Sequence, residues 1–323
     1  MPHTDVEREL RPATLDDAQL VADMETLRDP SEPRDPVLLR YWWQMGDELG
    51  QKMRRIQVRD GVAVAFLGVS HDPWSEGEKR FGIIRSLIRE DDWTDDGYDR
   101  LIRIGQDWLR DEEAEVAVVR IRDDRANELA VLDRLGYRED RRLRTSELDL
   151  VARRDQLLDA AARSRALLVA QGVEMHPLIE DTDPNKLHKL YALMVESEDD
   201  IPKSVPNAEL TFEEWKRFWL DHPAIREDRF WIARDGDDIV GCSVLDCPIV
   251  RGVPVTAHTG TLRKARGRGI ARALKYQSMA QAIEAGYTRV RTNNDAENPA
   301  ILRINGEMGY QLVAVIVELH CAL

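Results

Sequence analysis

A short run rich in arginine and glycine, residues 259–275, holds the side chains with the clearest chemical potential. It contains six Lys or Arg residues and no acidic residue, in a chain whose formal net charge is −14. Gly267 and Gly269 permit backbone conformations that let successive N–H groups converge on one point, at the positive end of the helix that the next residues predict. A site for a phosphate or pyrophosphate group is therefore expected here.

The elements around this run are the ones that such a site requires. Residues 253–262 predict a strand and residues 271–286 a helix, so the basic residues lie in the turn between them. The spacing Arg266-x-x-Gly269-x-Ala271 in that turn resembles the acyl-coenzyme A pyrophosphate signature of the GNAT N-acyltransferase superfamily. Without this context the same residues fit a solvated turn at a helix start.

The order of predicted elements occurs twice along the chain. Each copy reads strand, helix, helix, three strands, helix, strand, helix, strand, and a shift of 173 residues places Gly136 on Gly309. This order is that of a GNAT domain, and the tandem arrangement resembles the mycothiol synthase type. We expect an α/β (α+β) protein of two tandem GNAT folds, each a mixed, mostly antiparallel sheet flanked by helices. The predicted limits are residues 1–150 for the first domain, 151–171 for a connecting helix and 172–323 for the second domain.

Only the second copy keeps the basic loop. The same shift places Trp93, Thr94 and Asp96 where the second copy has Arg266 and two glycines. Residues 90–100 carry six acidic side chains against one arginine, a local charge of −5 that would repel a pyrophosphate. We expect the first domain to leave coenzyme A unbound and to serve as scaffold, substrate-channel wall or dimer surface.

The resemblance implies that acetyl-CoA binds along the end of the strand, in the loop and at the first turn of the helix. Backbone groups of the strand would contact the pantetheine arm, and one of its N–H groups would polarise the thioester carbonyl. Asn298, which also suits an N-cap before Pro299, would contact the cofactor from the start of the last helix. The implied cofactor-binding residues are Thr261, Leu262, Arg263, Arg266, Gly267, Arg268, Gly269, Ile270, Ala271 and Asn298.

The residues for proton transfer match the family less well. The resemblance implies a Tyr on the last helix, four residues before a Gly-aromatic pair, but this chain has Asn305 there. The Glu that some members carry early in the central strand is also missing. His258 on that strand is the expected proton acceptor and Thr259 the residue that positions a water, although a His on a strand is also typical of a packed core residue.

Acidic side chains near the site offer contacts for a cationic amine. Asp246 lies near the end of the preceding strand, and four more acids, Glu196, Glu198, Asp199 and Asp200, lie between the first two helices of the second copy. In the GNAT fold that connection borders the acceptor site. A solvated charged face explains the same run of acids.

Composition excludes several other classes of protein. The chain has 323 residues, 43% of them hydrophobic and 33% charged, with three cysteines. Neither a disulfide framework, nor metal-ligand spacing, nor an apolar segment of membrane-spanning length is expected. A pI of about 5.1 argues against nucleic-acid binding, because neutralising phosphates needs a broad basic face. We expect a cytoplasmic monomer or homodimer.

Together these features predict an N-acetyltransferase. It would move an acetyl group from acetyl-CoA, as co-substrate, to the amine of a small molecule or peptide by direct attack on the thioester. The missing Tyr and Glu leave a second hypothesis, a non-catalytic acyl-CoA-binding or interaction protein. Turnover with an amine separates the two hypotheses.

Overall fold

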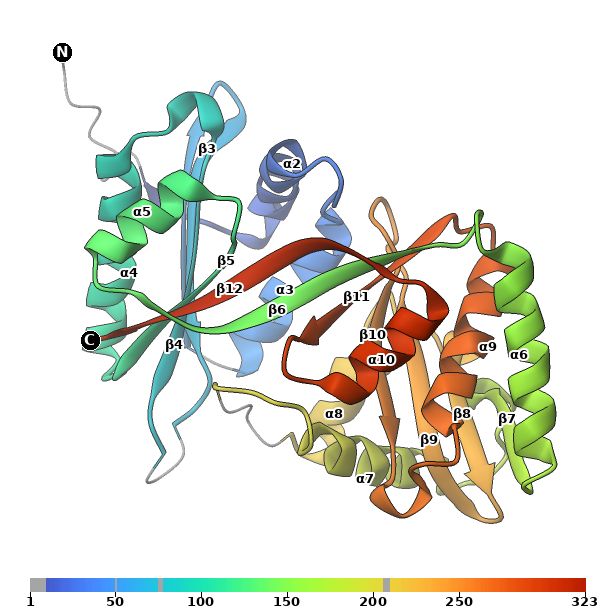
Figure 1. Cartoon of the computed structure of the whole chain (residues 1–323). Helices are drawn as coiled ribbons and strands as arrows, with labels where there is room; N and C mark the ends of the chain where they lie inside the picture. The colour runs from blue at the N-terminus through green and yellow to red at the C-terminus, as the bar shows by residue number, and fades with distance from the viewer. Residues whose placement is uncertain (1–9, 50, 75–77, 206–209) are drawn as a thin grey trace.

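The computed structural model describes residues 10–49, 51–74, 78–205 and 210–323. Its strands form one continuous 12-stranded sheet with the order β1-β2-β3-β4-β5-β12-β6-β11-β10-β9-β8-β7. The sheet crosses the whole molecule (Figure 1). The strands are β1 (Arg11–Pro12), β2 (Gln51–Arg59), β3 (Val62–His71), β4 (Phe81–Ile88), β5 (Val116–Arg122), β6 (Arg138–Asp149), β7 (Val173–Pro177), β8 (Phe230–Asp235), β9 (Asp238–Asp246), β10 (Val255–Thr261), β11 (Arg289–Asp295) and β12 (Gln311–Ala322).

Helices cover both faces of this sheet. Within β3, Leu67 packs on the face covered by α4, and its neighbour Phe66 packs on the opposite face, toward α2. In the second half, α9 and α7 likewise pack on β9 from two sides. The mixed sheet flanked by helices confirms the predicted α/β fold. The helices are α2 (Ala18–Arg28), α3 (Pro36–Leu49), α4 (Asp95–Asp111), α5 (Ala126–Arg134), α6 (Arg154–Val169), α7 (Lys186–Glu198), α8 (Phe212–Trp219), α9 (Ile270–Glu284) and α10 (Pro299–Met308).

None of the helices in the described ranges combines the length and the apolar character that crossing a membrane requires.

The two halves exchange their closing strands. The last strand of the chain, β12, pairs with β5 of the first half and with β6, while β6 also pairs with β11 of the second half. Figure 1 shows β6 and β12 running side by side between the halves. The sequence analysis does not predict this exchange, because both strands follow the same order of elements and carry no local signal of which strand they will join.

Equivalent local features recur 173 residues apart. A short 3-10 helix precedes the central helix of each half, at Glu90–Asp92 and at Arg263–Ala265. Gly136 and Gly309 end equivalent helices with left-handed φ values of +87° and +94°, a conformation that favours glycine. The internal duplication therefore extends to backbone detail.

The parallel strand pairs also end at equivalent places. Pairing between β4 and β5 stops at Ile84 and Val119, and pairing between β10 and β11 stops at Thr256 and Thr292. A β-bulge at Ala257 then shifts the register of β10 against β9. Each half therefore has one point at which two parallel strands part.

Asp35 joins the two halves. One carboxylate oxygen accepts the N–H groups of Val37 and Leu38 at the start of α3. The other oxygen accepts backbone N–H groups from residues 249–251 of the second half, at 2.7, 2.6 and 3.3 Å. Asp35 is only 4% exposed, so these groups have little access to water.

Replacing Asp35 with Ala is expected to lower the free energy of unfolding by about 2–4 kcal/mol, because it removes a helix cap and leaves buried N–H groups unpaired. Urea denaturation measures the change. Asp91→Ala is the control, since that carboxylate is 81% exposed and pairs with the neighbouring Arg89. An Asp35→Ala variant as stable as the control would show that the carboxylate does not hold the halves together.

Candidate active site

The arginine–glycine loop joins β10 to α9 at the lower edge of the second half (Figure 1). Gly267 and Gly269 have left-handed φ values of +78° and +84°, and Gly269 is the N-cap of α9. A Cβ at Gly267 would meet no atom within 4 Å, so the backbone conformation and not a close neighbour requires glycine there. No side chain caps α9, which leaves its first N–H groups for an anion.

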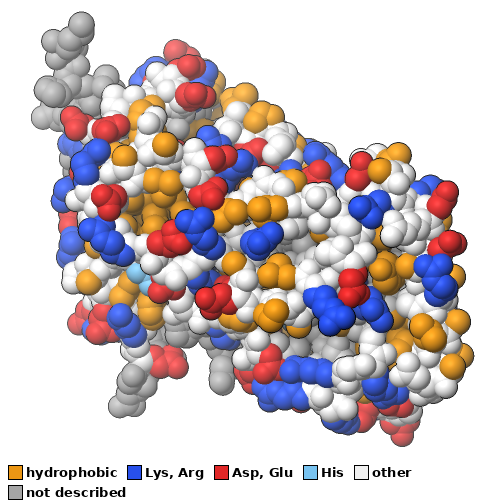
Figure 2. Space-filling model, viewed as in Figure 1, with side chains coloured by type: hydrophobic (Ala, Val, Ile, Leu, Met, Phe, Trp, Pro, Cys, Tyr) orange, Lys and Arg blue, Asp and Glu red, His pale blue; other side chains and the backbone are white. Residues whose placement is uncertain are grey.

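Acidic side chains at the end of α7 contact the cations of this loop. Asp200 Oδ1 lies 2.9 Å from Arg263 Nη2, and the other Asp200 oxygen pairs with Arg266. Glu196 accepts the Arg263 backbone N–H at 2.6 Å. Hydrogen bonds from the two arginines lower the pKa of Asp200 to about 2. Figure 2 shows acidic and basic side chains interleaved along the same edge of the molecule. Asp200 therefore competes for the guanidinium groups expected to bind a pyrophosphate.

Replacing Asp200 with Asn is expected to tighten acetyl-CoA binding. Solvent screens the exposed ion pairs to Arg263 and Arg266, so their loss should lower Kd by a factor of up to only about 5. Titration calorimetry measures the change, with the exposed α6 variant Asp159→Asn as control. Unchanged or weaker binding in Asp200→Asn would contradict the proposed competition.

His258 lies on β10 against α7, with only 5% of its surface exposed. Its Nε2 is 2.9 Å from Ser197 Oγ, and its Nδ1 is 3.2 Å from Glu198 Oε1. Ser197 donates its own proton to the Met194 carbonyl oxygen, 3.1 Å away. Nε2 therefore donates to Ser197 while Nδ1 donates to Glu198, which holds the ring as an imidazolium.

The surroundings of His258 favour this charged form. Burial alone would lower the pKa of His258, but contacts with Cys242 and Glu198 raise it more, to about 9. A Cβ at Gly260 would lie 2.4 Å from Ser197 Oγ, so glycine at that position lets α7 approach the strand. His258 is thus a buried, hydrogen-bonded imidazolium. Its ring must lose a proton before it can accept one from an amine.

Thr259 faces away from His258, because neighbouring residues of a strand point to opposite sides of the sheet. Its hydroxyl lies 3.1 Å from Ser243 Oγ. The structure does not bring the two predicted catalytic side chains together. Two residues further on, Thr261 Oγ1 is buried and has no hydrogen-bond partner among the described residues.

Two asparagines on α10 have different surroundings. Asn298 caps the helix by accepting the Ile301 N–H at 3.4 Å, with Pro299 at the first helical positions. Asn305 is 3% exposed and donates from Nδ2 to Asn294 Oδ1 at 2.7 Å. Its Oδ1 has no hydrogen-bond partner in the described part of the chain. An amide at this position can donate a hydrogen bond to a thiolate but is not an acid at neutral pH.

Lys275 is a further functional candidate. In the sequence it is one of the six cations of residues 259–275, but in the structure it lies within α9 and not in the basic loop. It is 0% exposed on α9, and Nζ has no hydrogen-bond partner within the described ranges. The amine lies 5.2 Å from the centre of the Tyr310 ring, and burial lowers its pKa to about 7. In the sequence, Lys275 follows Leu274 and stands four residues before Met279, and both of these residues face the core. This helical spacing indicates that Lys275 faces the core as well.

Asp246, the acid predicted near the end of a strand, is the last residue of β9 and pairs with Val255 at the start of β10. Burial raises its pKa to about 6, with a smaller opposing effect from Arg34. Asp246 is thus a carboxyl group whose charge changes near neutral pH, beside the strand that carries His258.

Several solved structures share the fold of this chain. A GCN5-related N-acetyltransferase from Sphaerobacter thermophilus aligns over 97% of this chain and 95% of its own, with a TM-score of 0.68 and 17% identity. A tandem GNAT protein from the clavulanic acid biosynthesis pathway aligns over 97% and 98%, with a TM-score of 0.72 and 13% identity. A glucosamine N-acetyltransferase region of a fungal multi-domain β-N-acetylglucosaminidase aligns over 97% of this chain and 38% of that one, at 0.70 and 14%. The chain therefore has the tandem GNAT fold.

The family match is more specific than the fold. Residues 191–304 match the model of the Acetyltransferase (GNAT) family, and this range includes β10, the basic loop and most of α10. Residues 191–304, within the second half of the chain, are therefore similar to that family. No curated protein matches the chain by sequence.

Proposed function

We propose that the protein is an acetyl-CoA-dependent N-acetyltransferase acting on the amine of a small molecule or peptide. The observation that carries this proposal is the pair of left-handed glycines, Gly267 and Gly269, at the uncapped start of α9 and beside Arg266. Backbone N–H groups and a cation there meet the needs of a pyrophosphate, and the loop lies inside the family match.

The proposed cofactor site follows the chain from β10 into α9. The pantetheine arm would run along β10 where it parts from β11, and one β10 N–H would polarise the thioester carbonyl. The unpaired Thr261 hydroxyl suits a polar contact with that arm. The residues assigned to acetyl-CoA are Thr261, Leu262, Arg263, Arg266, Gly267, Arg268, Gly269, Ile270, Ala271 and Asn298.

The proposed chemistry is direct attack of the amine on the thioester. A C–N bond forms as the C–S bond breaks, and the amine proton must leave. We assign that proton to His258, which Glu198 orients, in the fraction of molecules where the ring is neutral. Thr259 contributes through its backbone rather than through its hydroxyl, which binds Ser243. The coenzyme A thiolate leaves, and we assign Asn305 to stabilise it, because its amide has a second N–H beside the one that it donates to Asn294.

Release of free coenzyme A thiol in the presence of a panel of amines tests this function. Amino sugars come first in the panel because one structural neighbour is a glucosamine N-acetyltransferase region, followed by aminoglycosides and peptide amines. Amine-dependent release that requires an intact loop supports the proposal. Since acetyl-CoA would be drawn from the cytoplasm, we place the protein there, as a monomer or homodimer.

A non-catalytic acyl-CoA-binding protein is the second candidate function. Asn305, in place of an acid, and the imidazolium state of His258 both favour it. Tight acetyl-CoA binding without thiol release for any amine, across the pH range in which His258 loses its proton, would select this candidate over the enzyme.

A further inference from the structure

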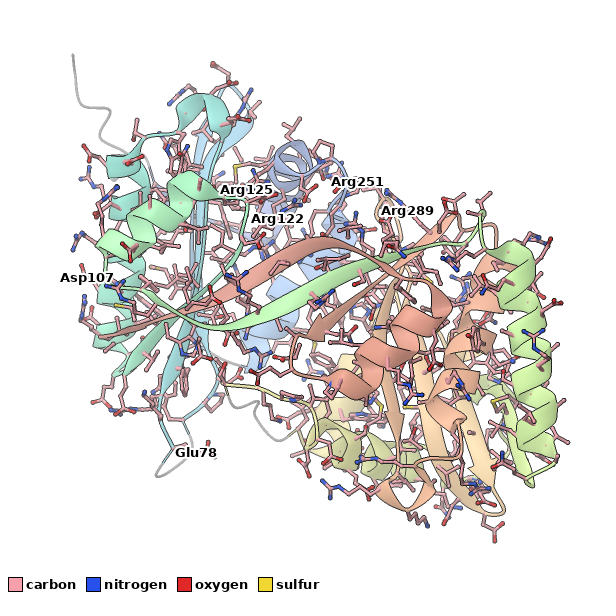
Figure 3. The ribbon with its side chains drawn as sticks, in the orientation of Figure 1. Glu78, Asp107, Arg122, Arg125, Arg251 and Arg289 are labelled. Atoms are coloured by element: carbon pink, nitrogen blue, oxygen red, sulfur yellow. The ribbon has the colours of Figure 1, made fainter. Side chains whose placement is uncertain are left out.

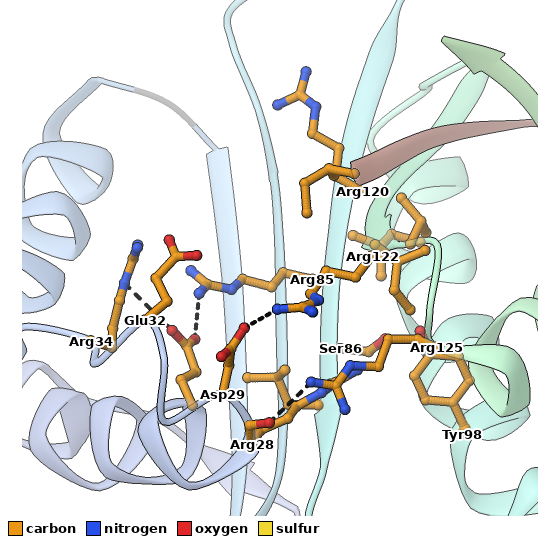
Figure 4. Close-up of a pocket in the computed structure, with 16 residues that line it drawn as sticks. Arg28, Asp29, Glu32, Arg34, Arg85, Ser86, Tyr98, Arg120, Arg122 and Arg125 are labelled. Atoms are coloured by element: carbon orange, nitrogen blue, oxygen red, sulfur yellow. Dashed lines mark hydrogen bonds and ion pairs between the residues drawn. The ribbon is translucent and has the colours of Figure 1, made fainter. Parts of the chain in front are cut away.

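A cavity of about 230 Å³ opens in the first half, where β4 and β5 part beyond Ile84 and Val119 (Figure 4). Its wall comes from α2, the loop that follows α2, β4, β5 and the start of α4. Six arginines and three carboxylates line it, together with Ser86 and Tyr98. The arginines are Arg28, Arg34, Arg85, Arg120, Arg122 and Arg125. This concentration of arginine is unexpected in a chain with a net charge of −14.

The cavity occupies the place in the first half that the candidate active site occupies in the second. Arg85 precedes His258 by the same 173 residues that separate the two 3-10 helices at Glu90–Asp92 and Arg263–Ala265. Arg85 directly follows the last parallel pair of its strand, and His258 follows the last parallel pair of β10 after the bulge at Ala257. Both halves thus have a point at which the parallel strands part. The residue beside it is a histidine in the second half and an arginine in the first.

Three of the arginines that line the cavity either share a carboxylate partner or lie at a long distance from one. Arg85 and Arg34 share Glu25, and the Arg34 contact is long, at 3.4 Å. Arg125 donates to the Arg28 carbonyl oxygen at 3.0 Å, and its nearest paired carboxylate oxygen, on Asp124, is 3.8 Å away. Figure 3 shows Arg122 and Arg125 next to each other on the side of α2.

The remaining arginines of the lining have closer partners. Arg28 pairs with Glu128 at 2.5 Å, Arg120 pairs with Glu318 at 2.6 Å, and Arg122 pairs with Asp29. Arg85 has 42% of its side chain open to solvent, about as much as Arg34 and Arg120, while desolvation by the protein around it lowers its pKa. In Figure 4 its side chain extends across the cavity, alongside the ion pair of Asp29 and Arg122. Its guanidinium is therefore within reach of a ligand that enters.

Coenzyme A does not suit this cavity. Glu90, Asp91 and Asp92 form the 3-10 helix that is Arg263–Ala265 in the other half, so a pyrophosphate would meet acids. The following helix begins with Asp95 instead of a left-handed glycine. A small ligand with a compact charge can use the arginines without extending to this acidic 3-10 helix.

We propose that the first-half cavity binds a small dianion, of the kind presented by a phosphate group or a short dicarboxylate. Planar guanidinium groups bind both through paired N–H donors. Arg34 and Arg85 share the single carboxylate of Glu25, and Arg125 lies 3.8 Å from that of Asp124, so these three arginines leave two positive charges for a dianion. Arg85 and Arg125 are the principal contacts, with Arg34 as a third. The site is separate from the acetyl-CoA loop and does not depend on the proposed acetyl transfer.

Titration calorimetry on the full chain tests the site with inorganic phosphate and with succinate, in a buffer free of other multivalent anions. We expect one equivalent of at least one probe to bind, and Arg85→Gln to weaken binding at least tenfold. Arg125→Gln, which leaves the ion pairs of Glu25 intact, should weaken it as well. Arg163→Gln, an exposed α6 arginine that is 68% open to solvent, is the matched control and should bind normally.

A further variant separates this site from the loop of the second half, which could also hold phosphate. Gly269→Glu disables that loop and leaves the first-half cavity unchanged. The Gly269→Glu variant should therefore still bind the dianion. Loss of binding in Gly269→Glu would place the anion on the acetyl-CoA loop and overturn the proposal. Absence of binding for both probes, or binding unaffected by Arg85→Gln and Arg125→Gln, would overturn it equally.

Discussion

Replacing Gly269 with Glu is expected to raise the Kd for acetyl-CoA about 30- to 1,000-fold, since two effects of about 1–2 kcal/mol each combine. The first is strain, because φ at Gly269 is +84° and a residue with a Cβ is disfavoured there. The second is charge, because a carboxylate at the N-terminus of α9 would occupy the N–H groups meant for the pyrophosphate. Calorimetric titration with acetyl-CoA measures the loss.

The chain offers a closely matched control for this variant. Gly286 follows the other end of α9, has the same φ of +84°, and a Cβ there would meet no atom within 4 Å. Gly286→Glu should therefore cost similar backbone strain and add the same charge, yet leave acetyl-CoA binding unchanged. Equal binding losses in both variants would mean that the effect comes from destabilised structure and not from the proposed pyrophosphate contact.

The second large effect is expected at His258. If the ring accepts the amine proton, His258→Ala should reduce kcat by about 10² to 10⁴. In the wild type, kcat/KM should rise with pH up to an apparent pKa near 9, because that is where the free protein gives up the imidazolium proton. An exposed histidine on α7, His188, supplies the control His188→Ala.

An acceptor amine also titrates in the alkaline range, so a second variant is needed to identify the group. Glu198→Gln removes the carboxylate 3.2 Å from His258 Nδ1 and should move the rising limb about 1–3 pH units lower. The titration of a substrate amine would not move. A limb that stays in place in Glu198→Gln, or a His258→Ala variant with full turnover, would remove His258 from the mechanism.

The raised pKa of His258 has a consequence for stability as well. Its folded-state pKa of about 9 lies above the unfolded value of about 6.5, so the protonated ring stabilises the fold fully below the unfolded value. This contribution is lost as the pH rises through about 9. Glu198→Gln should flatten that part of the stability profile.

The sequence was sufficient where a local pattern has only one structural solution. The glycine spacing around Arg266 leads to left-handed backbone at Gly267 and Gly269, directly before a helix. The repeated order of elements was sufficient for the tandem fold. The Glu196–Asp200 region was less clear, because acids at a helix end read equally well as a loop, and α7 continues to Glu198.

What the sequence could not provide are contacts between distant segments. The exchange of β6 and β12 depends on strand pairing across the two halves, and neither strand carries a local signal for it. The pairing of Asp200 with Arg266 joins residues 66 positions apart. The arginine cavity escaped notice for the same reason, because its members are scattered along the chain until the first-half strands and α2 bring them together.

The number of acetyl-CoA molecules bound per chain tests the central claim most directly. We expect one acetyl-CoA in the second half, on the loop with Gly267 and Gly269. We expect no acetyl-CoA in the first half, where Asp95 and Asp96 begin the equivalent helix. Calorimetry on the full chain should give one equivalent for the wild type and none for Gly269→Glu. Two equivalents in the wild type, or one that persists in Gly269→Glu, would contradict this account.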